Sequence, residues 1–156
     1  MSRRRAALRR NVLPDAKYNS VLVAKFINIL MRDGKKSIAE NIFYYVIEKM
    51  AKDLKEDPLE IFQRVIDNVR PSVEVCSRRL GGATYQIPRE VSDYRALSLA
   101  TKWLASAANK RKNSAIRRKL YEEMLEAYNN RGFAIKMKEE VHKLAEANKA
   151  FAHFRW

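Results

Sequence analysis

Apolar residues recur at helical spacing through residues 19–50, and this pattern constrains the fold more than any other feature of the chain. Two stripes are separated by the turn Arg32-Asp33-Gly34-Lys35-Lys36. The first stripe consists of Leu22, Val23, Phe26, Ile27 and Leu30, and the second of Ile38, Ala39, Ile42, Tyr45, Val46 and Met50. The pattern predicts two amphipathic helices that bury these stripes against each other and against the rest of the chain.

Short polar residues and a glycine indicate where these two helices begin and end. Asn19 or Ser20 is expected to cap the first helix, because a short side-chain oxygen can accept a hydrogen bond from an amide of the first turn. Gly34 is expected to end this helix in the left-handed conformation that a Cβ disfavours. The turn then points Lys35 and Lys36 outward, either into solvent or toward an anionic partner.

Four further helices are predicted by the same spacing. Asp57, Pro58 and Glu60 are typical of a helix start, and Pro71 ends that third helix. Its stripe consists of Leu59, Phe62, Val65, Ile66 and Val69, and the fourth helix, capped by Ser92 and Asp93, has Tyr94, Leu97, Thr101, Leu104 and Ala108. The fifth, capped by Asn113 or Ser114, has Ile116, Leu120, Met124 and Ala127, and the sixth has Met137, Val141, Leu144 and Ala145. Residues 18–150 therefore predict a single, mostly α-helical domain that resembles a six-helix bundle.

The one strand-like segment of the chain lies between the third and fourth helices, at residues 72–88. Val73 and Val75 alternate with polar residues, a second β-type run follows Gly81-Gly82, and Pro88 closes it. This pattern predicts a β-hairpin, whose base must lean on the helices while its tip protrudes. Near that tip lie two cations and one aromatic residue, Arg78, Arg79 and Tyr85. These residues either enter a nucleic-acid groove, or their charges only protect an edge strand from aggregation.

The positive charge of the chain is concentrated in segments. The formal net charge is +14, from 32 basic and 18 acidic residues. Residues 21–70 hold nine basic and eight acidic side chains, whereas residues 1–20 hold six and one, and residues 101–119 hold seven and none. Such gathering indicates a contact surface for a polyanion, of which nucleic acid is the commonest.

The two ends of the chain add to this predicted surface. Residues 1–17 predict a basic extended arm, which either orders on binding or serves only solubility. Residues 151–156 predict an aromatic and basic tail, which is buried either on the domain or on stacked bases. Trp103 also has two possible roles, as part of the core or as a surface on which a base stacks. The candidate contacts are Arg3, Arg4, Arg5, Arg9, Arg10, Lys17, Lys25, Arg32, Lys35, Lys36, Arg78, Arg79, Tyr85, Arg95, Lys102, Lys110, Arg111, Lys112, Arg117, Arg118, Lys119, Lys136, Arg155 and Trp156.

The sequence shows no sign of an enzyme, a cofactor, a metal site or a small-molecule substrate. No glycine-rich loop precedes Gly34, so a P-loop is not predicted. His142 and His153 lack the spacing of metal ligands, and His142 is expected to be exposed. The acidic residues of the fifth helix are expected on a solvated face: Glu122, Glu123 and Glu126.

Two further observations limit the compartment. No apolar run approaches the roughly 20 residues that a membrane span requires. The single cysteine, Cys76, rules out an internal disulfide, as expected of a reducing cytoplasm, and it has no histidine or aspartate neighbour that would indicate a nucleophile;.

Several motifs spread over the whole chain are specific in combination. They are Pro14-Asp15, Lys17-Tyr18, Phe26-Ile27-Asn28, Met31-Arg32-Asp33-Gly34-Lys35-Lys36, Asn68-Val69-Arg70-Pro71, the run 74–85, and Ala145-Glu146-Ala147-Asn148 with the terminal Trp156. In these motifs the chain resembles the small-subunit ribosomal protein seven family in its bacterial form. The resemblance implies six helices with a hairpin between the third and fourth, which agrees with the prediction above.

The resemblance also implies a function and partners. It implies a cytoplasmic protein of the small ribosomal subunit that binds small-subunit (16S) rRNA and nucleates assembly of the head, the 3′ major domain. It implies a place at the subunit interface near the decoding centre, with the hairpin beside the exit-site tRNA and the mRNA. Ribosomal proteins nine and eleven would be neighbours. The arm, Lys35, Lys36, Arg78, Arg79 and the stretch 110–119 would touch RNA.

Three alternatives remain open at this point. The chief one is an architectural DNA-binding protein whose β-ribbon enters the minor groove. A binder of anionic membranes would need helices with exposed aromatic faces, whereas the predicted stripes are committed to a core. An RNA-processing enzyme would need metal-binding acids beside the basic surface, and none stands out.

Overall fold

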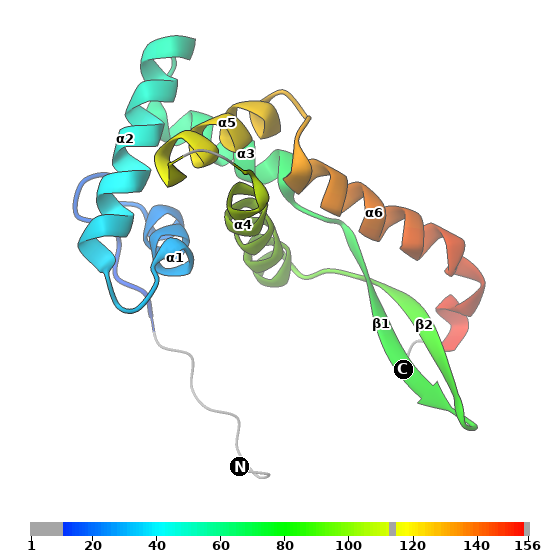
Figure 1. Cartoon of the computed structure of the whole chain (residues 1–156). Coiled ribbons are helices and arrows are strands. Elements are labelled where there is room, and N and C mark those ends of the chain that lie inside the picture. The colour runs from blue at the N-terminus through cyan, green and yellow to red at the C-terminus, as the bar shows by residue number, and fades with distance from the viewer. Residues whose placement is uncertain (1–10, 113–114, 155–156) are drawn as a thin grey trace.

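The computed structural model describes residues 11–112 and 115–154, and its architecture is mostly helical (Figure 1). Its helices are α1 (Val21–Leu30), α2 (Lys36–Leu54), α3 (Pro58–Val69), α4 (Asp93–Lys110), α5 (Ile116–Tyr128), α6 (Phe133–Ala147) and the short 3-10 helix η1 (Lys149–Phe154). The strands β1 (Val73–Leu80) and β2 (Ala83–Glu90) lie between α3 and α4. The predicted fold class, six helices with one hairpin between the third and fourth, is confirmed.

Three phenylalanine rings from the first three helices form the centre of the core. Phe26, Phe43 and Phe62 are completely buried, and their ring centroids lie 5.0 to 5.6 Å apart. Tilted and edge-on contacts at this separation add to the favourable burial of apolar surface. The core extends through side chains of α4 and α5, namely Leu104, Leu120 and Met124.

Five residues that the stripes assign to the core lie at the surface instead. They are Ile38, Tyr45, Leu59, Tyr94 and Leu144. The other predicted residues of α2 and α3 are buried, and α2 also buries Phe43 and Ile47, and α3 Ile61, which the predicted stripes omit. These helices carry apolar residues around more than one face, so spacing alone does not determine which face is buried.

The helix ends agree with the prediction in part. The Ser20 hydroxyl accepts a hydrogen bond from the Val23 amide at 3.5 Å, and Asp57 caps α3. However, α1 ends at Leu30 and not at Gly34, because Gly34 (φ +72°) lies in the left-handed turn that precedes α2. The expected caps of α5, Asn113 and Ser114, lie outside the described residues.

The hairpin is longer than predicted. β1 and β2 pair antiparallel without interruption from Val73–Glu90 to Leu80–Ala83, so Pro88 lies inside β2 and does not close it. A two-stranded ribbon has two open edges, and a proline without an N–H is tolerated there. Gly81 (φ +57°) and Gly82 (φ +89°) form the turn in the region that glycine enters most readily;.

The hairpin and α6 leave the helical body side by side and form a single projection (Figure 1). The aromatic rings of Tyr85 in β2 and Phe151 in η1 lie 5.4 Å apart, so the described part of the C-terminal tail packs on the ribbon. His142 of α6 is half-buried and accepts a hydrogen bond from the Ser72 amide at 3.2 Å. The prediction of an exposed His142 is therefore wrong, because α6 folds back over the start of β1.

Candidate nucleic-acid interface

Cations from two distant segments meet beside the turn between α1 and α2. Arg32 and Lys35 of this turn and Lys119 of α5 line one cavity, and among the described residues no acidic side chain lines it. Lys36 is exposed next to them and forms an ion pair of 3.6 Å with Glu40. We call Arg32, Lys35, Lys36 and Lys119 the body patch. The exposed Asp33 in the same turn and Glu40 offset part of this charge, but the patch keeps a net positive charge, which favours an anionic partner;.

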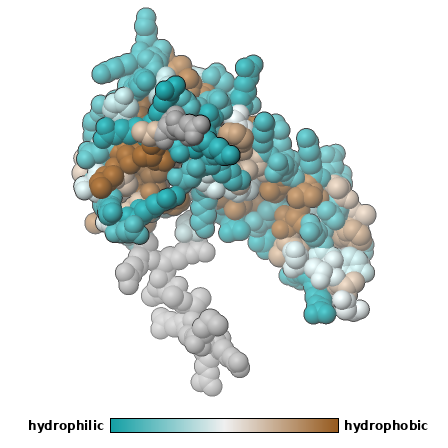
Figure 2. Space-filling view, viewed as in Figure 1, coloured by the Kyte–Doolittle hydropathy of each residue, from teal (hydrophilic) through white to brown (hydrophobic). Residues whose placement is uncertain are grey.

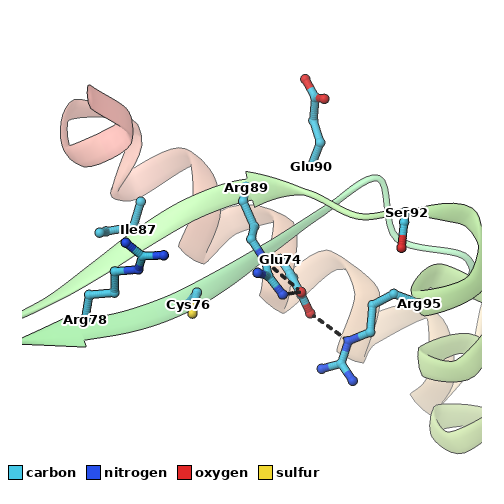
Figure 3. Close-up of a pocket in the computed structure, with 8 residues that line it drawn as sticks. All are labelled: Glu74, Cys76, Arg78, Ile87, Arg89, Glu90, Ser92 and Arg95. Carbon is cyan, nitrogen blue, oxygen red and sulfur yellow. Dashed lines mark hydrogen bonds and ion pairs between the residues drawn. The ribbon is translucent and has the colours of Figure 1, made fainter. Parts of the chain in front are cut away.

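A second group of cations surrounds one carboxylate at the base of the hairpin (Figure 3). Glu74 of β1 is buried and accepts hydrogen bonds from Arg89 of β2 at 2.6 and 3.0 Å and from Arg95 of α4 at 3.2 Å. Together with Arg78 they line a hollow. We call Arg78, Arg89 and Arg95 the hairpin patch. The sequence analysis missed Arg89, although its cross-strand pairing with Glu74 would have indicated it once the register was known;.

The protonation of Glu74 follows from this arrangement. Burial raises the pKa of its carboxyl, but the hydrogen bonds from Arg89 and Arg95 outweigh that effect, and the pKa lies below its usual value;. The carboxylate is therefore charged at neutral pH and ties the ribbon to α4. Both arginine side chains are still half exposed, so their remaining N–H groups can reach a ligand;.

Arg78 and Arg79 do not point to the same side of the ribbon. They are consecutive in β1, opposite Tyr85 and Thr84 respectively, and successive side chains of a strand alternate between its faces;. Both are exposed. The outer half of the hairpin therefore presents a cation on each face.

Arg111 is held by carboxylates and is mostly buried. Its guanidinium contacts Glu122 at 3.6 Å, Glu123 at 2.8 Å, and Glu126, and its side chain is 14% exposed. Glu123 is completely buried and also accepts a hydrogen bond from the Ala134 amide at 2.8 Å. The prediction of a solvated acidic face is wrong for Glu123, which joins the α4–α5 connection to the start of α6.

The other predicted cations are distributed over the body. Lys17 forms an ion pair with Glu48, and Arg118 one with Glu122. Several cations lie over aromatic rings, within 5.2 to 5.7 Å of the ring centroid: Lys25 over Tyr94, Arg117 over Tyr45 and Lys136 over Phe133. The exposed ones include Lys102, Lys110 and Lys112, whereas Trp103 packs partly against the core. The remaining candidates, Arg3, Arg4, Arg5, Arg9, Arg10, Arg155 and Trp156, lie outside the described residues.

Asp15 anchors the chain where the basic arm meets the body. It is buried, and its carboxylate accepts hydrogen bonds from the amides of Lys17 and Tyr18 at 3.1 Å and from the Tyr44 hydroxyl at 2.7 Å. Burial first, and then this hydrogen bond, raise the pKa of Tyr44 far above its usual value. The position of the arm's origin is thus fixed by α2.

In the two described ranges, no three His, Cys, Asp or Glu side chains are grouped so as to hold a metal ion. None of the helices in those ranges combines the length and the apolar composition that crossing a membrane requires.

Comparison with known proteins identifies the family. The sequence model of the family described as ribosomal protein S7p/S5e matches residues 2–149. The small ribosomal subunit proteins uS7 of Desulfatibacillum aliphaticivorans and Acidithiobacillus ferrooxidans are each 55% identical to this chain over 156 residues, the full length of both chains. That of Petrotoga mobilis is 53% identical over 154 residues, covering 99% of each chain. With this degree of identity along its whole length, and with the predicted helices and hairpin in place, the chain belongs to the ribosomal protein S7p/S5e family.

Proposed function

We propose that this chain is a non-catalytic component of the small ribosomal subunit in the cytoplasm and that it binds small-subunit rRNA directly. In this proposal it nucleates assembly of the head and lies at the subunit interface near the decoding centre. Its hairpin lies by the exit-site tRNA and the mRNA, and ribosomal proteins nine and eleven are its neighbours. Family membership supports the ribosomal setting, and the body patch supports contact with RNA.

The body patch carries the proposal because it is not required by the fold. Arg32 and Lys35 are exposed, and they converge with Lys119 although folding alone would separate like charges;. Lys119 lies in the first turns of α5, where positive charge opposes the helix macrodipole;. Bound phosphates would compensate for both unfavourable arrangements.

The mechanism is electrostatic neutralisation combined with shape. Cations of the two patches replace the counterions of RNA phosphates, and this release drives binding. Side chains cannot read the deep major groove of A-form RNA, so specificity comes from how the body and the projecting hairpin match a folded RNA. The hairpin has cations on both faces, Arg78 and Arg79, so it can contact phosphates on either side of a groove or a junction. Arg111 supports the α4–α5 connection, while Lys110 and Lys112 beside it are free to face RNA.

The test is competition binding with salt titration. The full chain should prefer folded small-subunit rRNA to duplex DNA at equal salt, whereas an architectural DNA-binding protein would bind both equally. The Lys35→Ala/Arg79→Ala double variant should weaken binding, and the slope of log affinity against log salt should fall by about 1.4 to 1.8, the value for two phosphate contacts.

Lys52→Ala is the matched control for Lys35→Ala. Lys52 is exposed at the opposite end of α2, away from the turn, so its removal should leave affinity and slope unchanged. If the double variant also leaves both quantities unchanged, the assignment of the body patch and of Arg79 to RNA contact is wrong. If the wild type shows no preference for rRNA, the proposed function itself fails.

A further inference from the structure

The cavity of the body patch has an apolar floor. Its lining includes Leu30 of α1, Ile38 and Ile42 of α2, and Ile116 of α5. Figure 2 shows hydrophobic surface open to solvent on this side of the helical body, with hydrophilic residues around it. Ile38 is 54% exposed, and the cavity measures about 280 Å³. An open hydrophobic hollow of this size is at the lower limit for a small ligand.

The rim of this cavity defines the chemistry of an occupant. Three cations, Arg32, Lys35 and Lys119, surround the apolar floor. Among the described residues, no acidic side chain lines the cavity. Asn109 at the end of α4 adds an amide that can both donate and accept hydrogen bonds;. The site therefore combines an apolar floor, a polar edge and several anion-binding groups.

We propose that this cavity receives one unstacked nucleobase of the bound RNA. The base would lie on Ile38 and Ile42, its edge would meet the Asn109 amide, and its flanking phosphates would meet Lys35, Lys119 and Arg32. The inference rests on the proposed function and extends it, because it assigns a specific contact to a single-stranded or bulged nucleotide. RNA-binding proteins obtain sequence and shape discrimination from bases that leave the helical stack.

Charge and size favour a nucleotide over a protein segment. A protein helix bound here would need acidic residues to pair with the three cations at the rim. The cavity is also narrow for a helix, which is about 10 Å across. A nucleotide supplies both the planar apolar body and the anionic groups in one unit. The phosphodiester charge then lies at the rim, where it remains partly hydrated.

Salt dependence separates the base contact from the phosphate contacts. Ile38→Ala removes three carbons of which about half the surface is open, so losing a docked base should weaken rRNA binding about five- to tenfold;. The salt slope should stay at the wild-type value, because no ionic contact is removed. Lys35→Ala should instead weaken binding and lower the slope by nearly one.

Leu59→Ala is the matched control. It shortens an exposed apolar side chain on α3, outside the cavity, and should leave rRNA affinity unchanged. Circular dichroism of each variant verifies that the fold is retained. A weakened Ile38→Ala with an unchanged slope supports the base site.

The contrary results are distinguishable. If Ile38→Ala binds rRNA as tightly as wild type while Lys35→Ala binds more weakly and with a smaller salt slope, the cavity does not hold a base. Of the two proposed contacts, the phosphate contact alone would then be supported. A protein partner on the apolar floor would give this same result. If wild type does not prefer rRNA at all, the proposed function and this inference fail together.

Discussion

Substitution of the buried Glu123 should destabilise the fold. The loss of stability should depend on how many of the hydrogen bonds of its carboxylate the new side chain can still make. Glu123 meets the Arg111 guanidinium at 2.8 Å and the Ala134 amide at 2.8 Å. In Glu123→Gln the amide oxygen can still accept from Ala134, but the new NH2 group cannot accept from Arg111. The loss of one charge-assisted bond predicts about 1.5–3 kcal/mol.

Glu123→Ala should be more severe, because both bonds are lost. It leaves the Ala134 N–H buried without its acceptor, and it leaves Arg111, 14% exposed, with Glu122 and Glu126 as its carboxylate partners among the described residues. We expect a loss of about 3–5 kcal/mol, the range found when one partner of a buried pair is deleted. For a domain of this size such a loss is a large part of the total stability.

Urea unfolding followed by circular dichroism measures both effects. The midpoint should fall in the order wild type, Glu123→Gln, Glu123→Ala, with little change in the denaturant slope. The double variant Arg111→Met/Glu123→Leu should recover part of the loss, because it removes the mostly buried guanidinium that has lost its buried partner. Glu122 and Glu126 also lose Arg111, but both are exposed enough to be hydrated, whereas the Ala134 amide stays unsatisfied. A Glu123→Ala variant within about 0.5 kcal/mol of wild type would refute the reasoning.

Three further predictions concern the projection formed by the hairpin and α6. Glu74→Gln should loosen the ribbon at its base, so that amides of β1 and β2 exchange hydrogen faster while those of α2 do not. Gly82→Ala should destabilise the turn by roughly 1 kcal/mol, because an alanine side chain disfavours the φ of +89° at this position;. The added methyl group would point into open space and meet no other atom, so no clash adds to this cost, and thermal unfolding measures the loss. Burial and Lys138 lower the pKa of His142, so the unfolded chain takes up its proton at higher pH. Stability should therefore fall as pH drops from about 7 to about 5, and in His142→Gln that fall should be smaller in urea titrations at each pH.

The order and type of the elements could be predicted from sequence. Helical spacing located six helices, and Gly81-Gly82 between two β-type runs located the hairpin and its turn. These are local properties of the chain. The exposure of Ile38 and Tyr45 was not predictable, because α2 has apolar residues on adjacent faces and the choice between them depends on how α1, α3 and α5 pack.

The site was predictable by segment but not by contact. Sequence placed Lys35 and Lys119 in separate basic stretches, and only the fold brings them to one cavity. Glu123 looked like an exposed helical glutamate because its partner, Arg111, precedes it by 12 residues in a connection of unknown path. Arg89 was missed because its role depends on the strand register, which Pro88 obscured by seeming to end the strand.

The link between Glu74 and Arg95 has a mechanical consequence for the length of the ribbon beyond it. The part of β1 beyond Glu74, residues 75–80, extends about 20 Å at roughly 3.3 Å per residue;. A tilt of about 10° at the base would thus move the tip by about 3.5 Å, most of the spacing between neighbouring β-strands. The position of the hairpin tip therefore depends on the Glu74 carboxylate at its base together with the packing of α6 and η1 along the ribbon, because a small angular error at the base grows with distance from it.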